Sequence, residues 1–351
     1  MKDNMKKNVL IVDDSALMRR VLSDIINRTE QYQVAGTAAN GLEALDVLHR
    51  STPIHFIFLD INMPKMGAVE MLKVMKREKL DIPTVVFSTV AERSSAETIE
   101  ALSLGAVDFL KKPDNMLVKM DSFRKKIFNA LSIMDRSEDE PPVIVKERVQ
   151  KRERRNHMGR GRLVAIACST GGPRALQEVV PYLPSNLEAP VLIVQHMPEG
   201  FTASLASRLN DISMIAVKEA AEGDVLENGK VYIAKGGSHM RVAHEHGQHV
   251  IRLGQEPPVN GLRPYANYMY ESLVQSDYYE IICVVLTGMG ADGTKGIGML
   301  SQEKNVYVIS QDRETSTVYG MPKMIAQSGL SDEILSLNKI AKAIINITGV
   351  C

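Results

Sequence analysis

Short apolar runs of strand length alternate along this chain with longer segments that have helical periodicity. Over residues 8–134, five apolar runs alternate with five helix-like segments. This alternation is typical of an open parallel sheet with helices wound on both faces, so it predicts a (βα)5 domain of the α/β class. The predicted strands are Val9–Val12, Val34–Thr37, Phe56–Leu59, Thr84–Phe87 and Val107–Leu110, and the predicted helices are Leu17–Arg28, Gly41–Arg50, Met66–Lys79, Ser94–Leu104 and Asp121–Met134.

A second α/β domain is predicted over residues 163–351, where the alternation resumes. We expect a doubly wound, mostly parallel sheet, with a β-hairpin formed by Met240–Ala243 and His249–Leu253. The other predicted strands are Leu163–Cys168, Val191–Val194, Met214–Val217, Val231–Ala234, Ile281–Leu286 and Val306–Ile309, and helices are expected at Arg174–Pro181, Phe201–Leu209, Pro264–Gln275, Met321–Ser328 and Asn338–Ile347.

Residues 135–162 separate the two predicted domains and carry an acidic stretch, two adjacent prolines and then a basic run, without an apolar face. This composition predicts a solvated, flexible linker that acts as a hinge. The basic run could instead bind nucleic acid, but it lacks interleaved aromatic residues, and the whole chain balances 42 Lys+Arg against 42 Asp+Glu. We therefore expect no nucleic-acid partner.

The amino terminus offers only a four-residue apolar run, which is too short for the core of a signal peptide. No later run approaches the length of a membrane span. Cys168, Cys283 and Cys351 form no spaced set, and the first two lie in apolar strands, which predicts buried free thiols rather than a disulfide or a metal site. We expect a cytoplasmic protein without membrane insertion.

Acidic residues follow the predicted strands of the first domain. Asp13 and Asp14 end the first strand and Asp60 ends the third, while Ser88 and Lys112 follow the fourth and fifth. The carboxyl ends of parallel strands share one edge of a sheet, so three carboxylates would converge there and bind a cation such as Mg²⁺. Alternatively, Asp14 is a helix N-cap, which would leave Asp60 and Lys112 unexplained.

Residues 8–134 resemble the receiver domain of two-component response regulators, through VDDS, the D-x-N-M-P turn at Asp60–Pro64, the hydroxyl of Ser88 and the F-x-x-K-P run at Phe109–Pro113. The resemblance implies that Asp60 accepts a phosphoryl group from a histidine kinase. It also implies an Mg²⁺ ion held by Asp14, Asp60 and the carbonyl of Asn62, with Asp13 nearby. Ser88, Phe109 and Lys112 would be the switch residues that respond to phosphorylation.

Three polar residues at strand ends of the second domain suggest acyl-transfer chemistry. Ser169 follows the strand in LVAIACSTGGP, His196 follows Val191–Val194, and Asp292 follows Ile281–Leu286. A serine becomes nucleophilic when a histidine takes its proton and a carboxylate orients that histidine. Ala167 replaces the first glycine of the G-x-S-x-G turn, so that motif is imperfect. His239 and His244 are alternative bases, but both lie in or beside the hairpin.

The TGMGADG stretch has a competing interpretation as a dinucleotide-binding loop. Gly288, Gly290 and Gly293 fit G-x-G-x-x-G, with Asp312 closing the next strand. However, a Rossmann fold places this motif in its first unit, and nucleotide binding would leave Ser169 and His196 without a role. We favour a loop whose backbone approaches the substrate, with a main-chain N–H near Met289 supporting an oxyanion.

Residues 163–351 resemble the catalytic domain of the chemotaxis protein-glutamate methylesterases. The matching stretches are ACSTGGP, QHMPEGFT, GDVLENGKVYIAKGGSHM, LTGMGADG and QDRETSTVYGMP. The resemblance implies Ser169 as nucleophile, His196 as base and Asp292 as orienting acid, with Thr170 and Met289 near the oxyanion. It further implies a cofactor-independent hydrolase that cleaves glutamate γ-methyl esters of methyl-accepting chemotaxis receptors and deamidates receptor glutamines.

Four positions depart from this family pattern. Cys168 precedes the nucleophile where a small residue is common, Lys235 replaces a proline, and Tyr265 and Asn267 stand where serine and aspartate are usual. The last two are expected near the substrate cleft, where they would affect receptor preference. The leading hypothesis is a phosphorylation-gated serine esterase, and the rival hypotheses are a non-enzymatic binding module and a nucleotide-dependent oxidoreductase.

Overall fold

The computed structural model describes residues 6–50, 52–88, 92–112, 116–135 and 161–350, and the chain divides into two compact units, Met1–Pro141 and Pro142–Cys351. Nearly all of the predicted linker 135–162 lies outside the described residues. The domain limits 8–134 and 163–351 therefore stay predictions. No helix in the described part of the chain is long and apolar enough to cross a membrane.

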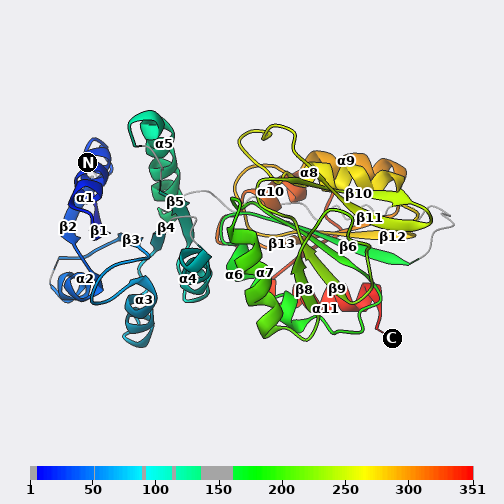
Figure 1. Ribbon diagram of the computed structural model, residues 1–351, viewed down its shortest axis with the longest axis horizontal. Helices are drawn as coiled ribbons and strands as arrows, with labels where there is room; N and C mark the ends of the chain where they lie inside the picture. The colour runs from blue at the N-terminus through cyan, green and yellow to red at the C-terminus, as the bar shows by residue number, and fades with distance from the viewer. Residues whose placement is uncertain (1–5, 51, 89–91, 113–115, 136–160, 351) are drawn as a thin grey trace. The chain divides into compact units, whose positions relative to one another are not determined.

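The first unit is the predicted (βα)5 fold. Its five strands form one sheet in the order β2-β1-β3-β4-β5, and every neighbouring pair is parallel. Figure 1 shows α1 and α5 on one face of this sheet and α2, α3 and α4 on the other. The elements are β1 Lys7–Val12, α1 Ala16–Asn27, β2 Tyr32–Ala38, α2 Gly41–Leu48, β3 Phe56–Asp60, α3 Ala68–Arg77, β4 Thr84–Ser88, α4 Glu92–Ser103, β5 Asp108–Lys111 and α5 Met116–Met134.

The burial of these strands explains why apolar runs in the sequence predicted their positions. The central strands β3 and β4 are buried along their whole length, because helices cover both faces of a parallel sheet. Phe58 of β3 stacks on Phe87 of β4 with ring centroids 5.5 Å apart, and Phe87 also contacts Phe123 of α5. Strand order and burial together place the ends of β1, β3 and β4 side by side at one edge.

The second unit contains a seven-stranded sheet in the order β14-β13-β12-β6-β7-β9-β8, and all its strand pairs are parallel. A separate antiparallel pair, β10 and β11, forms the hairpin. The strands are β6 Arg162–Cys168, β7 Val191–Gln195, β8 Ala216–Glu219, β9 Lys230–Ile233, β10 His239–Glu245, β11 Gln248–Gly254, β12 Glu280–Val285, β13 Val306–Gln311 and β14 Glu333–Leu335.

Helices cover both faces of this sheet, as expected for a doubly wound fold (Figure 1). They are α6 Gly172–Gln177, α7 Phe201–Ile212, α8 Ala266–Ser272, α9 Thr294–Glu303, α10 Met321–Gln327 and α11 Leu337–Thr348, with 3-10 turns η1 Val180–Tyr182 and η2 Leu273–Gln275. Cys168 and Cys283 are buried free thiols, which confirms that prediction. Cys351 lies outside the described residues.

Several predicted boundaries were wrong for local reasons. The segment predicted as one helix over Pro264–Gln275 is α8 followed by η2, and the strand expected near Met214–Val217 begins at Ala216. The hairpin loop is shorter than the predicted His244–Gln248, since β10 continues to Glu245 and β11 begins at Gln248. His246 and Gly247 have φ angles of 51° and 76°, the conformation of a tight two-residue hairpin turn.

Candidate functional site

Ser169 lies at the carboxyl edge of the second sheet, directly after β6. Because β6 pairs with β7 on one side and β12 on the other, the residues that follow those strands flank this serine. The Ser169 backbone N–H donates to the carbonyl of Thr287 at 3.0 Å, and the N–H of His196 donates to the carbonyl of Cys168 at 3.1 Å. The strand order therefore brings the predicted nucleophile and base to adjacent strand ends.

His196 and Asp292 form a buried pair. The Nε2 atom of His196 lies 2.8 Å from Oδ2 of Asp292, and their side chains are only 6% and 3% exposed. The Asp292 carboxylate also accepts backbone N–H groups of Ala266 at 2.6 Å, Asn267 at 3.0 Å and Gly293 at 2.8 Å. These donors fix the carboxylate and stabilise its negative charge, so Asp292 can orient the imidazole.

The alternative histidines have other partners. The ring of His239 packs edge-on against Tyr268, with centroids 4.9 Å apart, and its Nε2 lies 3.3 Å from the Pro257 carbonyl. The pKa of His239 is lowered, chiefly by burial, because a buried imidazole is costly to charge. The Nε2 atom of His244 lies 4.0 Å from Oδ2 of Asp277, in the loop before β12. Within the described residues, His196 is the histidine that contacts Asp292.

Two buried glutamine amides, which the sequence patterns did not predict, hold the loops after β6 and β12 in place. The Gln195 amide donates to the Ser169 carbonyl at 2.9 Å and accepts from the Cys168 thiol at 3.0 Å. Gln311 accepts from the backbone N–H of Thr287 at 2.8 Å. Both glutamines end strands at the same edge as Ser169, in QHMP and SQD, and a buried amide at such a position is the signal that could have identified them.

The departures from the family pattern have structural consequences. Burial raises the pKa of the Cys168 thiol, so this cysteine stays protonated and is no rival nucleophile. Asn267 is 2% exposed, and its side chain accepts from the Gly296 N–H at 2.6 Å and donates to the Tyr265 hydroxyl at 2.7 Å. The Asn267 side chain therefore contacts the first turn of α9, and the expected effect of Tyr265 and Asn267 on receptor preference stays a prediction.

Thr170 and Met289 lie on the two loops beside Ser169. Thr170 is 9% exposed and its carbonyl accepts from the Thr287 hydroxyl at 2.9 Å, whereas Met289 is 54% exposed. The Gly288 carbonyl accepts from the backbone N–H of Met321, the first residue of α10, at 2.7 Å. The oxyanion roles of Thr170 and Met289 stay predictions. The carboxylate of Asp312 accepts from Thr315 at 2.9 Å, which gives it a local role in a turn.

Gly288 leaves no room for a side chain beside Ser169, the predicted nucleophile. A Cβ atom there would approach the Met321 sulfur and would lie 2.8 Å from the Ser169 Cβ and 3.1 Å from its N. We expect Gly288→Ala to displace Ser169 and to reduce kcat for the predicted ester hydrolysis by about 100-fold, because small displacements of reacting groups are costly.

Steady-state hydrolysis by the folded variant tests this expectation. Gly298→Ala is the matched control, since a Cβ atom at Gly298 in α9 meets only a Leu330 methyl at 3.9 Å. Equal activity of both variants would show that Gly288 does not position the nucleophile.

The first unit contains the predicted acid pocket. Asp13 and Asp60 are 0% and 5% exposed, and the Lys112 ammonium lies 3.0 Å from Asp13 Oδ2 and 2.8 Å from Asp60 Oδ1. Burial raises the pKa of Asp60 to about 6, although Lys112 opposes this shift and the charges of Asp13 and Asp14 add to it. Burial lowers the pKa of Lys112, but the two carboxylates outweigh burial and leave that pKa raised.

This pocket fits a hard divalent cation. One carboxylate oxygen from each of Asp13, Asp14 and Asp60 lies within 4.8 Å of the others. Asp13 Oδ2 is buried and lies 3.0 Å from the Lys112 ammonium, on the side of the pocket that an ion would share with this lysine. Carboxylate oxygens are the ligands that Mg²⁺ prefers. The N-cap of α1 is Ser15, which accepts from Met18 N–H at 3.3 Å, so the alternative role for Asp14 was wrong.

The predicted switch residues Ser88 and Phe109 lie in β4 and β5. Ser88 is buried at the end of β4, and its hydroxyl accepts from Thr98 of α4 at 2.7 Å. Phe109 is half-buried in β5, and Asn62 is exposed in the loop after β3. The sequence did not identify Thr98, which links Ser88 to α4. The switch roles of Ser88 and Phe109 and the carbonyl ligand from Asn62 stay predictions.

Comparison with known proteins agrees with this organisation. The CheB methylesterase family matches residues 164–344, and the response regulator receiver domain matches residues 9–120. A protein-glutamate methylesterase/protein-glutamine glutaminase of Pyrococcus abyssi is 40% identical over 346 residues, covering 97% of this chain and 93% of the relative. A protein of the same name from Geobacillus kaustophilus is also 40% identical, with coverage of 97% and 98%.

The crystal structure of the Thermotoga maritima CheB methylesterase catalytic domain is 40% identical in sequence and covers 54% of this chain and 99% of that domain, with a TM-score of 0.52. The catalytic unit described above thus has a solved structural relative over nearly the whole of that domain. Together with the full-length relatives, this shows that the chain belongs to the CheB methylesterase family, with a receiver domain preceding the methylesterase domain.

Proposed function

We propose that this protein is a phosphorylation-activated serine hydrolase that removes methyl groups from glutamate γ-methyl esters of chemotaxis receptors. The observation that carries the proposal is the buried His196–Asp292 pair at the strand end next to Ser169. Family membership supplies the substrate class, since the full-length relatives bear the name protein-glutamate methylesterase/protein-glutamine glutaminase. The protein would act in the cytoplasm, where receptor signalling segments and the kinase are found.

In the proposed reaction, Ser169 attacks the ester carbonyl while His196 takes the hydroxyl proton. Because Nε2 of His196 bonds to Asp292, Nδ1 is the ring nitrogen left to serve as base. Collapse of the tetrahedral intermediate breaks the ester bond, and His196 returns its proton to the departing methanol. Water then attacks the acyl-enzyme while His196 takes its proton. The bond to the Ser169 oxygen breaks, His196 returns the proton to that oxygen, and the glutamate carboxylate is released. With a glutamine substrate, ammonia leaves in place of methanol.

The receiver would control this activity through Asp60. A histidine kinase or a small phosphodonor transfers a phosphoryl group to the Asp60 carboxylate, close to the Lys112 ammonium. Asp13, Asp14 and Asp60 would hold Mg²⁺, which neutralises phosphoryl charge when bound. We propose that the unphosphorylated receiver excludes the receptor from Ser169 and that phosphorylation favours an open arrangement. A change of a few kcal/mol in the free-energy difference between the two arrangements is enough.

Methanol release from methylated receptor membranes tests the whole proposal. We expect release by the full-length protein, with a higher rate when Mg²⁺ and a small phosphodonor are both added. An equal rate of release with and without the phosphodonor would support the esterase and contradict control by the receiver. No release under either condition would favour a protein whose second domain only binds receptors.

Replacing Asp60 with alanine separates the two activities. Asp60→Ala should abolish the response to phosphodonor, because the acceptor carboxylate is missing, while basal methanol release persists. The control is Asp24→Ala, an exposed position of α1 away from the pocket, which should respond normally. Chelation of Mg²⁺ should have the same selective effect on the wild type. Loss of basal hydrolysis in Asp60→Ala would contradict a purely regulatory role for the receiver.

A further inference from the structure

The tip of the β10–β11 hairpin and the loop before β12 bring two histidines and an aspartate together. His244 and His249 are direct cross-strand partners, one pair away from the His246–Gly247 turn. The His249 carbonyl accepts from Leu226 N–H at 2.9 Å, so the backbone of His249 points away from β10. In such a non-hydrogen-bonded pair, the two side chains approach each other closely on one face of the hairpin.

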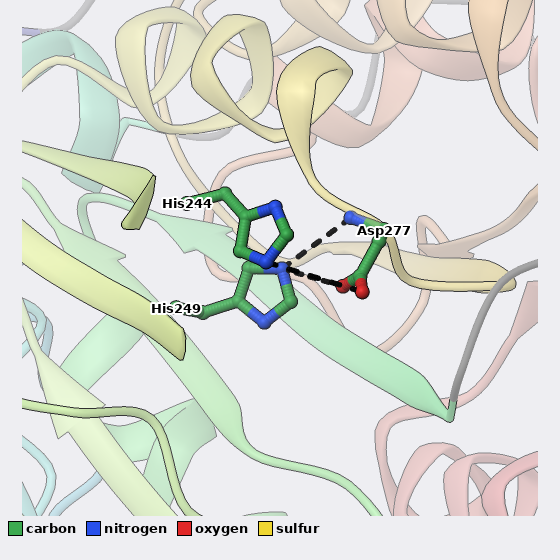
Figure 2. Close-up of side chains that lie close together, drawn as sticks. All are labelled: His244, His249 and Asp277. Carbon is green, nitrogen blue, oxygen red and sulfur yellow. Dashed lines mark hydrogen bonds and ion pairs between the residues drawn. The ribbon is translucent and has the colours of Figure 1, made fainter. Parts of the chain in front are cut away.

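The two imidazole rings are arranged with their Nε2 atoms toward the same carboxylate. Their centroids are 4.7 Å apart with a 19° interplanar angle, and His249 in turn stacks on Tyr278 at 4.2 Å. His249 Nε2 lies 2.9 Å from Asp277 Oδ1, and His244 Nε2 lies 4.0 Å from Asp277 Oδ2. Figure 2 shows both rings directing this nitrogen at Asp277 from the hairpin side. The Nε2 atom of His249 also accepts the backbone N–H of Asp277 at 3.4 Å, a contact that a bound ion would replace.

These three side chains supply the kinds of ligand atom that a tetrahedral transition metal takes. Zinc bound at about 2.0–2.1 Å by each ligand requires ligand atoms roughly 3.3 Å apart, so the two rings and the carboxylate would have to rotate to bring both imidazoles to one ion. The three ligand atoms lie within 4.8 Å of one another. We propose that His244, His249 and Asp277 bind a divalent transition-metal ion such as Zn²⁺, with water in the fourth position.

The donor set distinguishes this site from the acid pocket of the receiver. Two imidazole nitrogens and one carboxylate oxygen favour Zn²⁺, Cu²⁺ or Ni²⁺ over Mg²⁺. The His244 side chain is 32% exposed and Asp277 46%, so an ion can enter from solvent.

The position of the cluster indicates a stabilising role. Asp277 precedes β12, whereas Asp292 follows that strand, so the cluster lies at the amino edge of the sheet and the catalytic residues at its carboxyl edge. A bound ion would join the hairpin tip to the segment between η2 and β12. Ester hydrolysis should therefore be unaffected by the metal, while the resistance of this unit to unfolding should increase.

Calorimetric titration of the full-length protein with Zn²⁺, in buffer with excess Mg²⁺ to fill the acid pocket, tests the proposal. We expect one Zn²⁺ per chain and a melting temperature raised by about 5–10 °C when free Zn²⁺ is a hundredfold above Kd. Titration with Co²⁺ should give the visible absorption of a tetrahedral site. His244→Asn and Asp277→Asn should weaken this binding by at least roughly 100-fold, because even outer-shell changes cost up to that much.

His246→Asn is the matched control. His246 lies at the same hairpin tip, is exposed, and has a φ angle of 51° that asparagine tolerates. This variant should bind Zn²⁺ as the wild type does. Absence of Zn²⁺ binding by the wild type, unchanged affinity in His244→Asn, or loss of the site in His246→Asn would each overturn the assignment. His244 is partly exposed, so its replacement is not expected to impair folding, and a thermal melt without metal checks this.

Discussion

Replacing Ser169 with alanine should reduce ester hydrolysis by at least about 10⁴-fold while leaving the protein folded. The expected loss is large because alanine cannot form the acyl intermediate. Folding should persist, since Gln195 and Thr287 hold this turn through the main-chain atoms of residue 169 rather than through its hydroxyl. Alanine also keeps the Cβ atom that packs against the Gly288 loop.

Methanol release and labelling by a serine-directed fluorophosphonate measure this effect independently. The wild type should be labelled at Ser169 and the alanine variant should not. Ser207→Ala, at an exposed position of α7, is the control and should keep full labelling and activity. Hydrolysis that persists in folded Ser169→Ala would place the nucleophile elsewhere.

Asp292→Asn should lower kcat by about 10³–10⁴-fold with little change in structure. Oδ2 of Asp292 accepts both the His196 ring and the N–H of Ala266, and Oδ1 accepts two further backbone N–H groups. Asparagine has the same shape but only one acceptor oxygen, so its NH₂ group must face donors. The variant would no longer hold His196 in the tautomer whose Nδ1 serves as base. Neutral asparagine also cannot stabilise the imidazolium that forms.

A single-turnover assay with a saturating ester substrate isolates this chemical step. The expected signature is a lower rate of acylation with unchanged labelling capacity after long incubation. Asp211→Asn on α7 is the control, because this aspartate is exposed and remote in sequence from the catalytic loops. A loss below tenfold would mean that His196 is oriented by something other than Asp292.

The sequence by itself determined the class of fold and the identity of the strand-end residues. Strands such as β3 and β12 are buried on both faces, so they must be continuous apolar runs, and the first polar residue after each run marks the carboxyl edge of the sheet. Asp60 and Ser169 were predicted in this way, and His196 and Asp292 were predicted from the loops that follow two neighbouring runs. The hairpin loop was predicted too long, because a two-residue turn needs positive φ angles that His246 did not signal.

Only the tertiary structure decided which residues support those groups. Ala266 and Asn267 hold Asp292 through backbone N–H groups about 25 positions earlier in the chain, and their side chains give no hint of that contact. The pairing of His249 with Asp277, 28 positions apart, depends on how the hairpin folds back over the loop before β12. Local periodicity reports burial and the ends of elements, whereas contacts between loops depend on the packing of elements that are distant in the chain.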